Sequence, residues 1–305
     1  MLRLLSWPCK HTCFSSRKKV SGSAILLLAI ALSPLHRQCA DSGEKADVDA
    51  MVDALLQSKA EVVRLSGPAV TDEHLKRLRA LPQLRELSLI KTKVTDEGIQ
   101  HVAVHKKLDT LTIRDCDVGD DAMKQVAKLG EVWRLVLTGT KVGDAGMKDL
   151  VRLKKLKELS VGPGVTDRGM IEIGKMAGLT SLMLREVSVT DKGLKELAAI
   201  KGLLSLSLYE SKVTDDALEG LIGVESLRGL NLEGTKVSDG GMAHLTKLQK
   251  LYDLGLRRTA ITDLGMARLV GVPKLSILDV AGTRVTGEGV KEFQKKREKV
   301  RVSTR

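Results

Sequence analysis

The sequence predicts an α/β solenoid, a curved horseshoe of stacked units with parallel strands on the concave face and helices on the convex face. A tripeptide resembling Val-Thr-Asp recurs along the 305 residues at intervals of 24 residues, with one interval of 23. Apolar residues before each tripeptide have strand spacing, and those after it have helix spacing. Aromatic residues make up only 2% of the chain, so aliphatic side chains must build thin, repeated core layers. The tripeptides begin at Val70, Val94, Val118, Val142, Val165, Val189, Val213, Val237, Ile261 and Val285.

The apolar spacing changes within each repeat. Leu206 and Leu208 are two residues apart, which places both side chains on one face of a strand. Leu218 and Leu221 then follow at a separation of three, which is typical of a helix. One such unit cannot bury its own apolar face, so the leucines of neighbouring coils must stack. We therefore expect Leu206 in the core and Ser207 on the opposite face, free of packing.

Polar residues at fixed positions predict how each coil is closed. The Thr hydroxyl can cap an unpaired N–H group at the start of a helix, and Asp in the first turn meets the positive end of the helix dipole. A glycine often follows two residues after the Asp, where its small size permits close packing. The position after the strand mostly carries a hydroxyl, which we expect to bond backbone groups of the adjacent coil. Val187 occupies this position in one coil and has no hydroxyl, so we expect that coil to lack this hydrogen bond to its neighbour.

The repeat LxxLxLxxTxVTDxGLxxLxxLxx resembles the leucine-rich-repeat family over about residues 47–300. It is similar to the repeats of F-box-associated proteins, of ribonuclease-inhibitor-like horseshoes and of bacterial relatives with 24-residue units. The resemblance implies the horseshoe architecture and a binding role rather than catalysis. It does not separate an open scaffold from an enzyme inhibitor that acts by occlusion.

The N-terminal residues 1–40 read as a signal peptide or export segment. Basic residues 17–19 precede an apolar run from Ala24 to Leu32, and small residues follow. The run is too short for a stable span, which needs about 20 residues, although an uncleaved anchor remains an alternative. We therefore expect an exported protein, in the periplasm, at the cell surface or secreted, without a stable membrane span after processing. Residues 41–58 form a predicted N-terminal capping helix on the apolar spacing of Val48, Met51, Val52, Leu55 and Leu56.

The repeats fill residues 59–290, a solenoid of about ten units, and residues 291–305 form a predicted basic C-terminal cap. Lys295, Lys296, Arg297, Lys299 and Arg301 would keep the last edge charged and the protein monomeric. The formal charge of +12 lies mostly at the two ends, because residues 41–290 carry about +1. This distribution argues against nucleic acid as a partner.

The side chains that alternate with the buried leucines are expected to face the concave surface. Its richest group for binding is predicted to be Arg185, Tyr209, Glu233, Arg257 and Arg258. Arginine and aromatic residues carry much of the binding energy at protein interfaces. We therefore expect this patch to contact a protein partner.

Catalytic, metal and cofactor motifs are not recognisable. His101 and His105 could share a helix face and bind a metal, but exposed helix residues are the simpler interpretation. One Asp per 24 residues supplies too few oxygens for a calcium ladder, because calcium needs six to eight. The sequence thus predicts a non-catalytic protein-binding scaffold without cofactors. Enzyme inhibition by occlusion is the alternative, and a ligase-adaptor-type substrate receptor is less favoured because residues 41–58 are too few for an F-box domain.

Overall fold

The computed structural model describes residues 40–41 and 45–304, so the predicted export segment lies outside the described residues except for its last position. Residues 39–305 form one compact unit. Within the described part of the chain, no helix has both the length and the apolar character to cross a bilayer.

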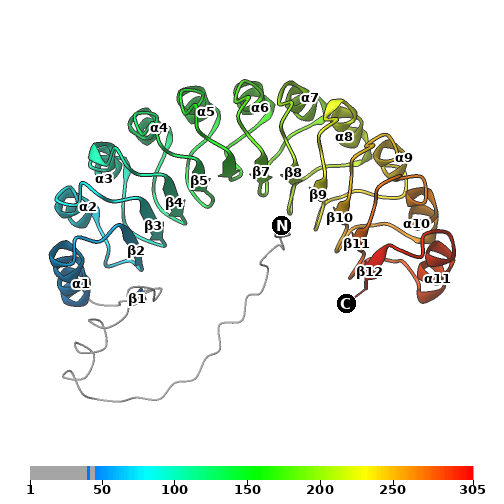
Figure 1. The fold of residues 1–305 in the computed structure, drawn as a ribbon, viewed down its shortest axis with the longest axis horizontal. Helices are drawn as coiled ribbons and strands as arrows, with labels where there is room; N and C mark the ends of the chain where they lie inside the picture. Colours follow the sequence, from blue (N-terminus) through cyan, green and yellow to red (C-terminus); the bar gives the residue numbers. More distant parts are fainter. Residues whose placement is uncertain (1–39, 42–44, 305) are drawn as a thin grey trace, which may run out of the picture. The chain divides into compact units, whose positions relative to one another are not determined.

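Twelve described strands form one parallel sheet in which each strand pairs with its neighbours in the sequence (Figure 1). Leu206 pairs in register with Leu182 on one side and Leu230 on the other. The strands are β1 (Ala40–Asp41), β2 (Val62–Ser66), β3 (Glu86–Ile90), β4 (Thr110–Arg114), β5 (Arg134–Leu137), β6 (Glu158–Val161), β7 (Ser181–Leu184), β8 (Ser205–Ser207), β9 (Gly229–Asn231), β10 (Asp253–Gly255), β11 (Ile277–Asp279) and β12 (Arg301–Ser303). The predicted parallel-stranded solenoid is confirmed.

A short helix lies on the outer side of each coil, and the strands line the inner side (Figure 1). The predicted helix start at the Thr-Asp pair is confirmed where Thr95, Thr166, Thr190 and Thr262 accept the N–H of the second residue after them. The α-helices are α1 (Lys45–Gln57), α2 (Asp72–Leu78), α3 (Asp96–Gln100), α4 (Asp120–Val126), α5 (Asp144–Leu150), α6 (Asp167–Gly174), α7 (Asp191–Lys195), α8 (Asp215–Glu219), α9 (Met242–Leu245), α10 (Asp263–Leu269) and α11 (Gly287–Lys296). The 3₁₀ turns are η1 (Val102–Val104), η2 (Glu196–Ala199) and η3 (Gly220–Gly223).

The aspartates that open the helices also reach into the next coil. The Asp144 carboxylate accepts the Thr166 N–H at 2.8 Å, the Thr166 hydroxyl at 2.7 Å and the Gly169 N–H at 2.9 Å. Asp239 makes the same three contacts with Thr262 and Gly265. The sequence indicated only a contact with the helix dipole of the same coil. These inter-coil bonds form what we call the aspartate ladder, which ties most of the helix starts to the preceding coil.

The hydroxyls after the strands bond differently from the prediction. Thr140, Thr235 and Thr259 donate to the carbonyl three residues earlier in their own coil, at 2.7 to 2.8 Å. Only Ser211, which donates to the Leu184 carbonyl at 3.3 Å, and Cys116 reach the preceding coil. The expectation of inter-coil bonds was therefore wrong for these threonines, because a nearby carbonyl of the turn is within reach of the hydroxyl.

The ends of the stack are held by arginines. At the front, Arg77 of α2 forms ion pairs with Asp49 and Asp53 of α1, and it bonds Asp49 at 2.7 Å. Val48 and Val52 of α1 are buried. These contacts favour a capping role for residues 41–58, which remains a prediction, as does the division of the chain into domains.

Arg297 was expected to be an exposed edge charge, and this was wrong. Its guanidinium donates to the carbonyls of Val270, Val272, Pro273 and Leu275, at 2.9 Å to Val270 and 3.0 Å to Leu275. One side chain thus bonds four carbonyls of the connection from α10 to β11.

We expect Arg297→Ala to destabilise α11 and β12 by about 1–3 kcal/mol, because it removes charge-assisted bonds and leaves carbonyls without partners. Hydrogen exchange of residues 287–303 measures this local free energy of opening. Arg301→Ala is the control, since Arg301 is exposed on β12 and should change stability by less than about 0.5 kcal/mol. Equal protection in both variants would contradict the assigned role.

Candidate binding surface

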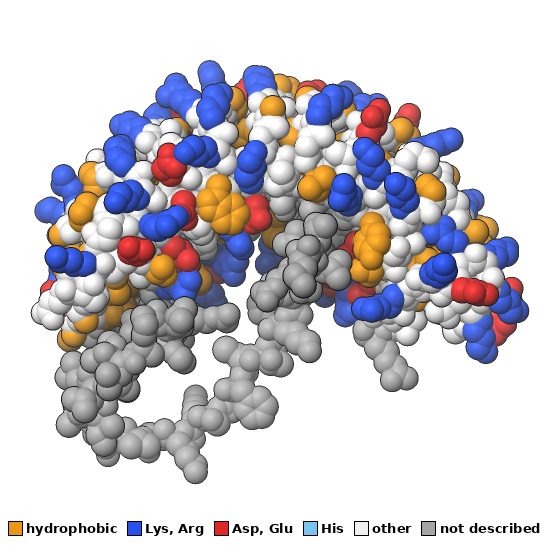
Figure 2. Space-filling view, in the orientation of Figure 1, with side chains coloured by type: hydrophobic (Ala, Val, Ile, Leu, Met, Phe, Trp, Pro, Cys, Tyr) orange, Lys and Arg blue, Asp and Glu red, His pale blue; other side chains and the backbone are white. Residues whose placement is uncertain are grey.

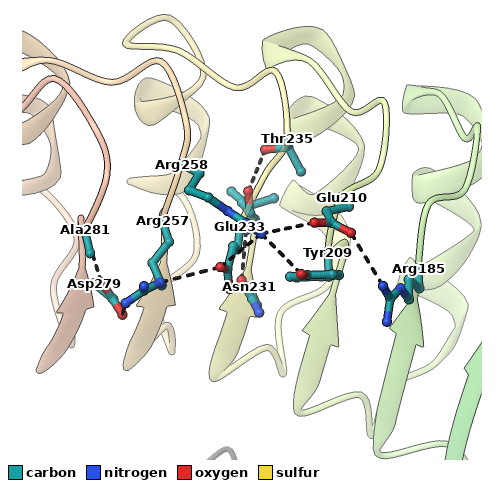
Figure 3. A network of polar contacts seen from close by, with 11 residues as sticks. Arg185, Tyr209, Glu210, Asn231, Glu233, Thr235, Arg257, Arg258, Asp279 and Ala281 are labelled. Carbon is teal, nitrogen blue, oxygen red and sulfur yellow. Dashed lines mark hydrogen bonds and ion pairs between the residues drawn. The ribbon is translucent and has the colours of Figure 1, made fainter. Parts of the chain in front are cut away.

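The predicted patch lies in the turns that leave the strands, at the carboxyl edge of the sheet (Figure 3). Arg185 directly follows β7, while Tyr209, Glu233 and Arg257 lie two residues beyond the ends of β8, β9 and β10. Arg258 adopts a left-handed backbone with φ of 52°. The expectation that these residues lie on the strand face was therefore wrong in detail: the patch is at the rim. The structure nevertheless brings all five residues together.

Tyr209 lies between two guanidinium groups. The Arg185 Cζ atom is 5.2 Å from the centroid of the Tyr209 ring, and the Arg258 Cζ atom is 5.8 Å from it. Both separations suit cation–π attraction. Arg258 also donates to the Tyr209 hydroxyl at 3.2 Å. These contacts fix the orientation of the ring before any partner arrives.

Carboxylates connect the arginines across the coils (Figure 3). Glu210 lies 3.1 Å from Arg258 and 3.6 Å from Arg185, while Glu233 lies 3.3 Å from Arg258 and 3.5 Å from Arg257. Ion pairs at such exposure contribute little stability individually, but several in one network hold one another in place. We call Arg185, Tyr209, Glu210, Glu233, Arg257 and Arg258 the Arg–Tyr cluster.

The electrostatics keep the cluster charged. The pKa of Arg185 is raised by its hydrogen bond with Glu186, and the pKa of Arg258 is raised by its hydrogen bond with Tyr209. The guanidiniums are about half exposed and can still bond an incoming group. The arrangement therefore offers a rigid aromatic ring with charged donors and acceptors around it.

Sequence reasoning missed Glu210 and Asp279. Glu210 has φ of 54° and occupies the turn position that Glu186 and Arg258 hold in their coils. Only strand alternation was considered, and this position lies outside the strand. Aligning the turns at the 24-residue repeat places Glu210 at the same repeat position as Arg258, two coils earlier. Asp279, which lies 3.3 Å from Arg257, ends β11.

His105 is buried and does not form an exposed pair with His101, so that interpretation was wrong for His105. Its Nδ1 atom lies 3.0 Å from the Leu81 carbonyl oxygen of the preceding coil. Burial lowers the pKa of His105, which favours the neutral ring. Among the described residues, no group of three or more His, Cys, Asp or Glu could hold a metal ion.

The chain is similar to solved structures of leucine-rich-repeat proteins. An internalin from Listeria monocytogenes aligns with a TM-score of 0.54 at 18% identity, over 79% of this chain and 71% of the internalin chain. A leucine-rich-repeat protein from Leptospira interrogans aligns with a TM-score of 0.51 at 17% identity, over 75% of this chain and 68% of the other. No protein-family model and no curated protein matches the sequence significantly. These similarities show the fold: the chain folds as a solenoid of the leucine-rich-repeat type, as the repeat predicted.

Proposed function

We propose that this protein is an exported, non-catalytic scaffold that holds a protein partner against the concave side of the solenoid, with the Arg–Tyr cluster at the contact. The observation that carries the proposal is the preassembled Tyr209, held between Arg185 and Arg258. Because the ring is already fixed, little side-chain entropy is lost when a partner covers it. Tyr and Arg are also the residue types enriched among binding hot spots.

The extent of the cluster along the solenoid favours a large partner. Its contacts run from Arg185 after β7 to Asp279 of β11, across five successive coils. The sheet fixes these coils relative to one another through in-register pairing. Export is proposed on the charged and apolar order of residues 1–40 alone. Inhibition of an enzyme by occlusion is the second candidate function, because a partner held at this rim could have its own site covered.

A crosslinking pull-down of the full chain from its native cell tests the proposal. Arg185→Glu with Arg257→Glu should reduce partner capture at least about tenfold, because both residues belong to the cluster that the partner is proposed to cover. The matched control is Lys91→Glu with Arg114→Glu, since Lys91 occupies the turn position of Arg258 and Arg114 that of Arg257 in earlier coils. Equal capture by both double variants, or no partner at all, would reject the proposal. Loss of a captured enzyme's activity would identify the inhibitor function.

A further inference from the structure

The two edges of the sheet differ strongly in charge. All strands are parallel, so the helix-to-strand connections share the amino edge and the strand-to-helix connections share the carboxyl edge. We call the first group the amino flank. Its segments are 79–85, 101–109, 127–133, 151–157, 175–180, 199–204, 223–228, 246–252 and 270–276. These segments contain fifteen Lys or Arg and three Asp or Glu.

The carboxyl edge lacks this excess of cations. Its segments, each taken to include the Asp at or near the start of the next helix, contain eight Lys or Arg and fourteen Asp or Glu, and eight of these acids are the first residues of helices. The segments are 67–72, 91–96, 115–120, 138–144, 162–167, 185–191, 208–215, 232–239 and 256–263. The repeats as a whole are nearly neutral, but their amino flank is strongly basic. The total charge of the repeats does not reveal this difference between the two edges. A separated charge of one sign attracts an anionic surface even when the total is small.

The cations of the amino flank are mostly unneutralised. Two of its acids are already paired, Asp109 with Arg85 and Glu131 with Lys155. Exposed Lys157, Arg228 and Lys250 have no ion pair within residues 45–304. Figure 2 shows one face on which Lys and Arg side chains predominate over acids, with apolar side chains between them.

Three large apolar side chains of this flank occupy the same repeat position, directly before a strand. Trp133, Leu204 and Tyr252 are 38%, 38% and 40% exposed, and each immediately precedes a strand. Backbone bonds place cations beside them: the Lys157 N–H donates to the Trp133 carbonyl at 2.8 Å, and the Tyr252 N–H donates to the Arg228 carbonyl at 2.8 Å. Adjacent coils are about 4.8 Å apart at the sheet, so these apolar and basic groups lie on one regular line. In chain order the row is Arg85, Asp109, Trp133, Lys157, Thr180, Leu204, Arg228, Tyr252 and Ser276.

We propose that the amino flank docks the protein peripherally on a bilayer rich in anionic phospholipid. Trp and Tyr rings partition to the headgroup level of a bilayer, and Lys and Arg are attracted to anionic headgroups. The cations are spread over nine connections rather than gathered along one groove, which fits an extended surface better than a single polyanionic strand. A basic hollow of about 480 Å³ at the end of the flank, beside Lys274, Lys296 and Lys299, has room for a headgroup. This docking leaves the Arg–Tyr cluster, at the other edge, uncovered.

Sedimentation of the full chain with phosphatidylcholine vesicles, with and without phosphatidylglycerol, tests the proposal. We expect binding only to the anionic vesicles and its loss in high salt, since screening shortens the reach of the charges. Lys157→Glu, Arg228→Glu and Lys250→Glu together should weaken vesicle binding at least tenfold. Lys93→Glu, Lys212→Glu and Lys236→Glu are the control with the same change of net charge, because these exposed lysines lie at the carboxyl edge.

Every variant keeps residues 1–40, so a difference between the two triple variants reports on the amino flank alone. Trp133→Ala with Tyr252→Ala should also weaken binding, whereas Ile171→Ala with Leu264→Ala, on the helices α6 and α10, should not. Equal weakening by both triple variants would overturn the proposal. Undiminished vesicle binding by both triple variants would overturn it as well. The same holds if the protein binds single-stranded nucleic acid or an acidic polysaccharide but does not bind anionic vesicles.

Discussion

Leu206→Ala is expected to lower the free energy of unfolding by about 2–5 kcal/mol. Leu206 is fully buried and lies in register between Leu182 and Leu230, so its truncation opens a cavity in the middle of the stack. The neighbouring coils cannot close this cavity without breaking their own strand pairing. Urea denaturation followed by circular dichroism measures the change.

Ser207→Ala is the control, and its physical basis differs from the sequence prediction. Ser207 is 1% exposed, so it is not free on the concave face, and its buried hydroxyl has no hydrogen-bond partner among the described residues. Its neighbours across the strands are Met183 and Asn231. Removing an unpaired buried hydroxyl should change stability by less than about 0.5 kcal/mol or raise it slightly. Equal losses in Leu206→Ala and Ser207→Ala would show that the two faces are wrongly assigned.

The fold could be predicted because its determinants are periodic along the chain. Leu206 and Leu208 have strand spacing, the Thr-Asp pairs open helices, and the 24-residue interval stacks like positions on one another. What could not be predicted depends on where a side chain points. The Thr235 hydroxyl bonds a carbonyl of its own turn rather than one of the adjacent coil, and Arg297 bonds backbone carbonyls rather than facing water. Spacing alone does not choose between such alternatives.

Five of the six residues of the Arg–Tyr cluster were predicted from the sequence, but their arrangement and Glu210 were not. Arg185, Tyr209, Glu233 and Arg257 occupy one repeat position, so stacking had to bring them near each other. The placement of the Tyr209 ring between two guanidiniums depends on rotamers and on the left-handed turn at Arg258. Neither the rotamers nor this turn conformation follows from the 24-residue period, so the repeat does not predict them. Whether a partner uses the cluster is a separate question for the pull-down.

The aspartate ladder explains the glycine that follows two residues after most of the helix-opening aspartates. A Cβ atom built on Gly169 would lie 2.5 Å from Oδ1 of Asp144 and 2.9 Å from Cγ1 of Val165. The glycine is thus required by the carboxylate of the preceding coil rather than by its own backbone conformation. The sequence indicated the small residue but not the group it makes room for.

The coil of α8 shows what happens when this glycine is absent. Ala217 occupies the position, and the preceding Asp191 carboxylate bonds Lys195 at 3.2 Å instead of Thr214. Thr214 has no side-chain capping bond at the start of α8. The ladder bond to the threonine is thus absent at the junction of α7 and α8. In α4, Ala122 occupies the same position and the Asp96 carboxylate still accepts the Gly119 N–H at 2.6 Å, but that helix start carries no threonine hydroxyl.

Gly169→Ala is expected to reproduce that broken junction and to cost about 2–4 kcal/mol, since the added methyl group displaces Asp144 from three charge-assisted hydrogen bonds. Gly130→Ala is the matched control, because a Cβ at Gly130 meets no atom within 4 Å. It should be neutral within about 0.5 kcal/mol or slightly stabilising, because alanine restricts the unfolded chain. Urea denaturation compares the two variants, and hydrogen exchange at the start of α6 locates the loss. If Gly169→Ala and Gly130→Ala changed the free energy of unfolding equally, the ladder would contribute little to the stability of the contact between coils. The missing cap of α8 would then have a cause other than Ala217.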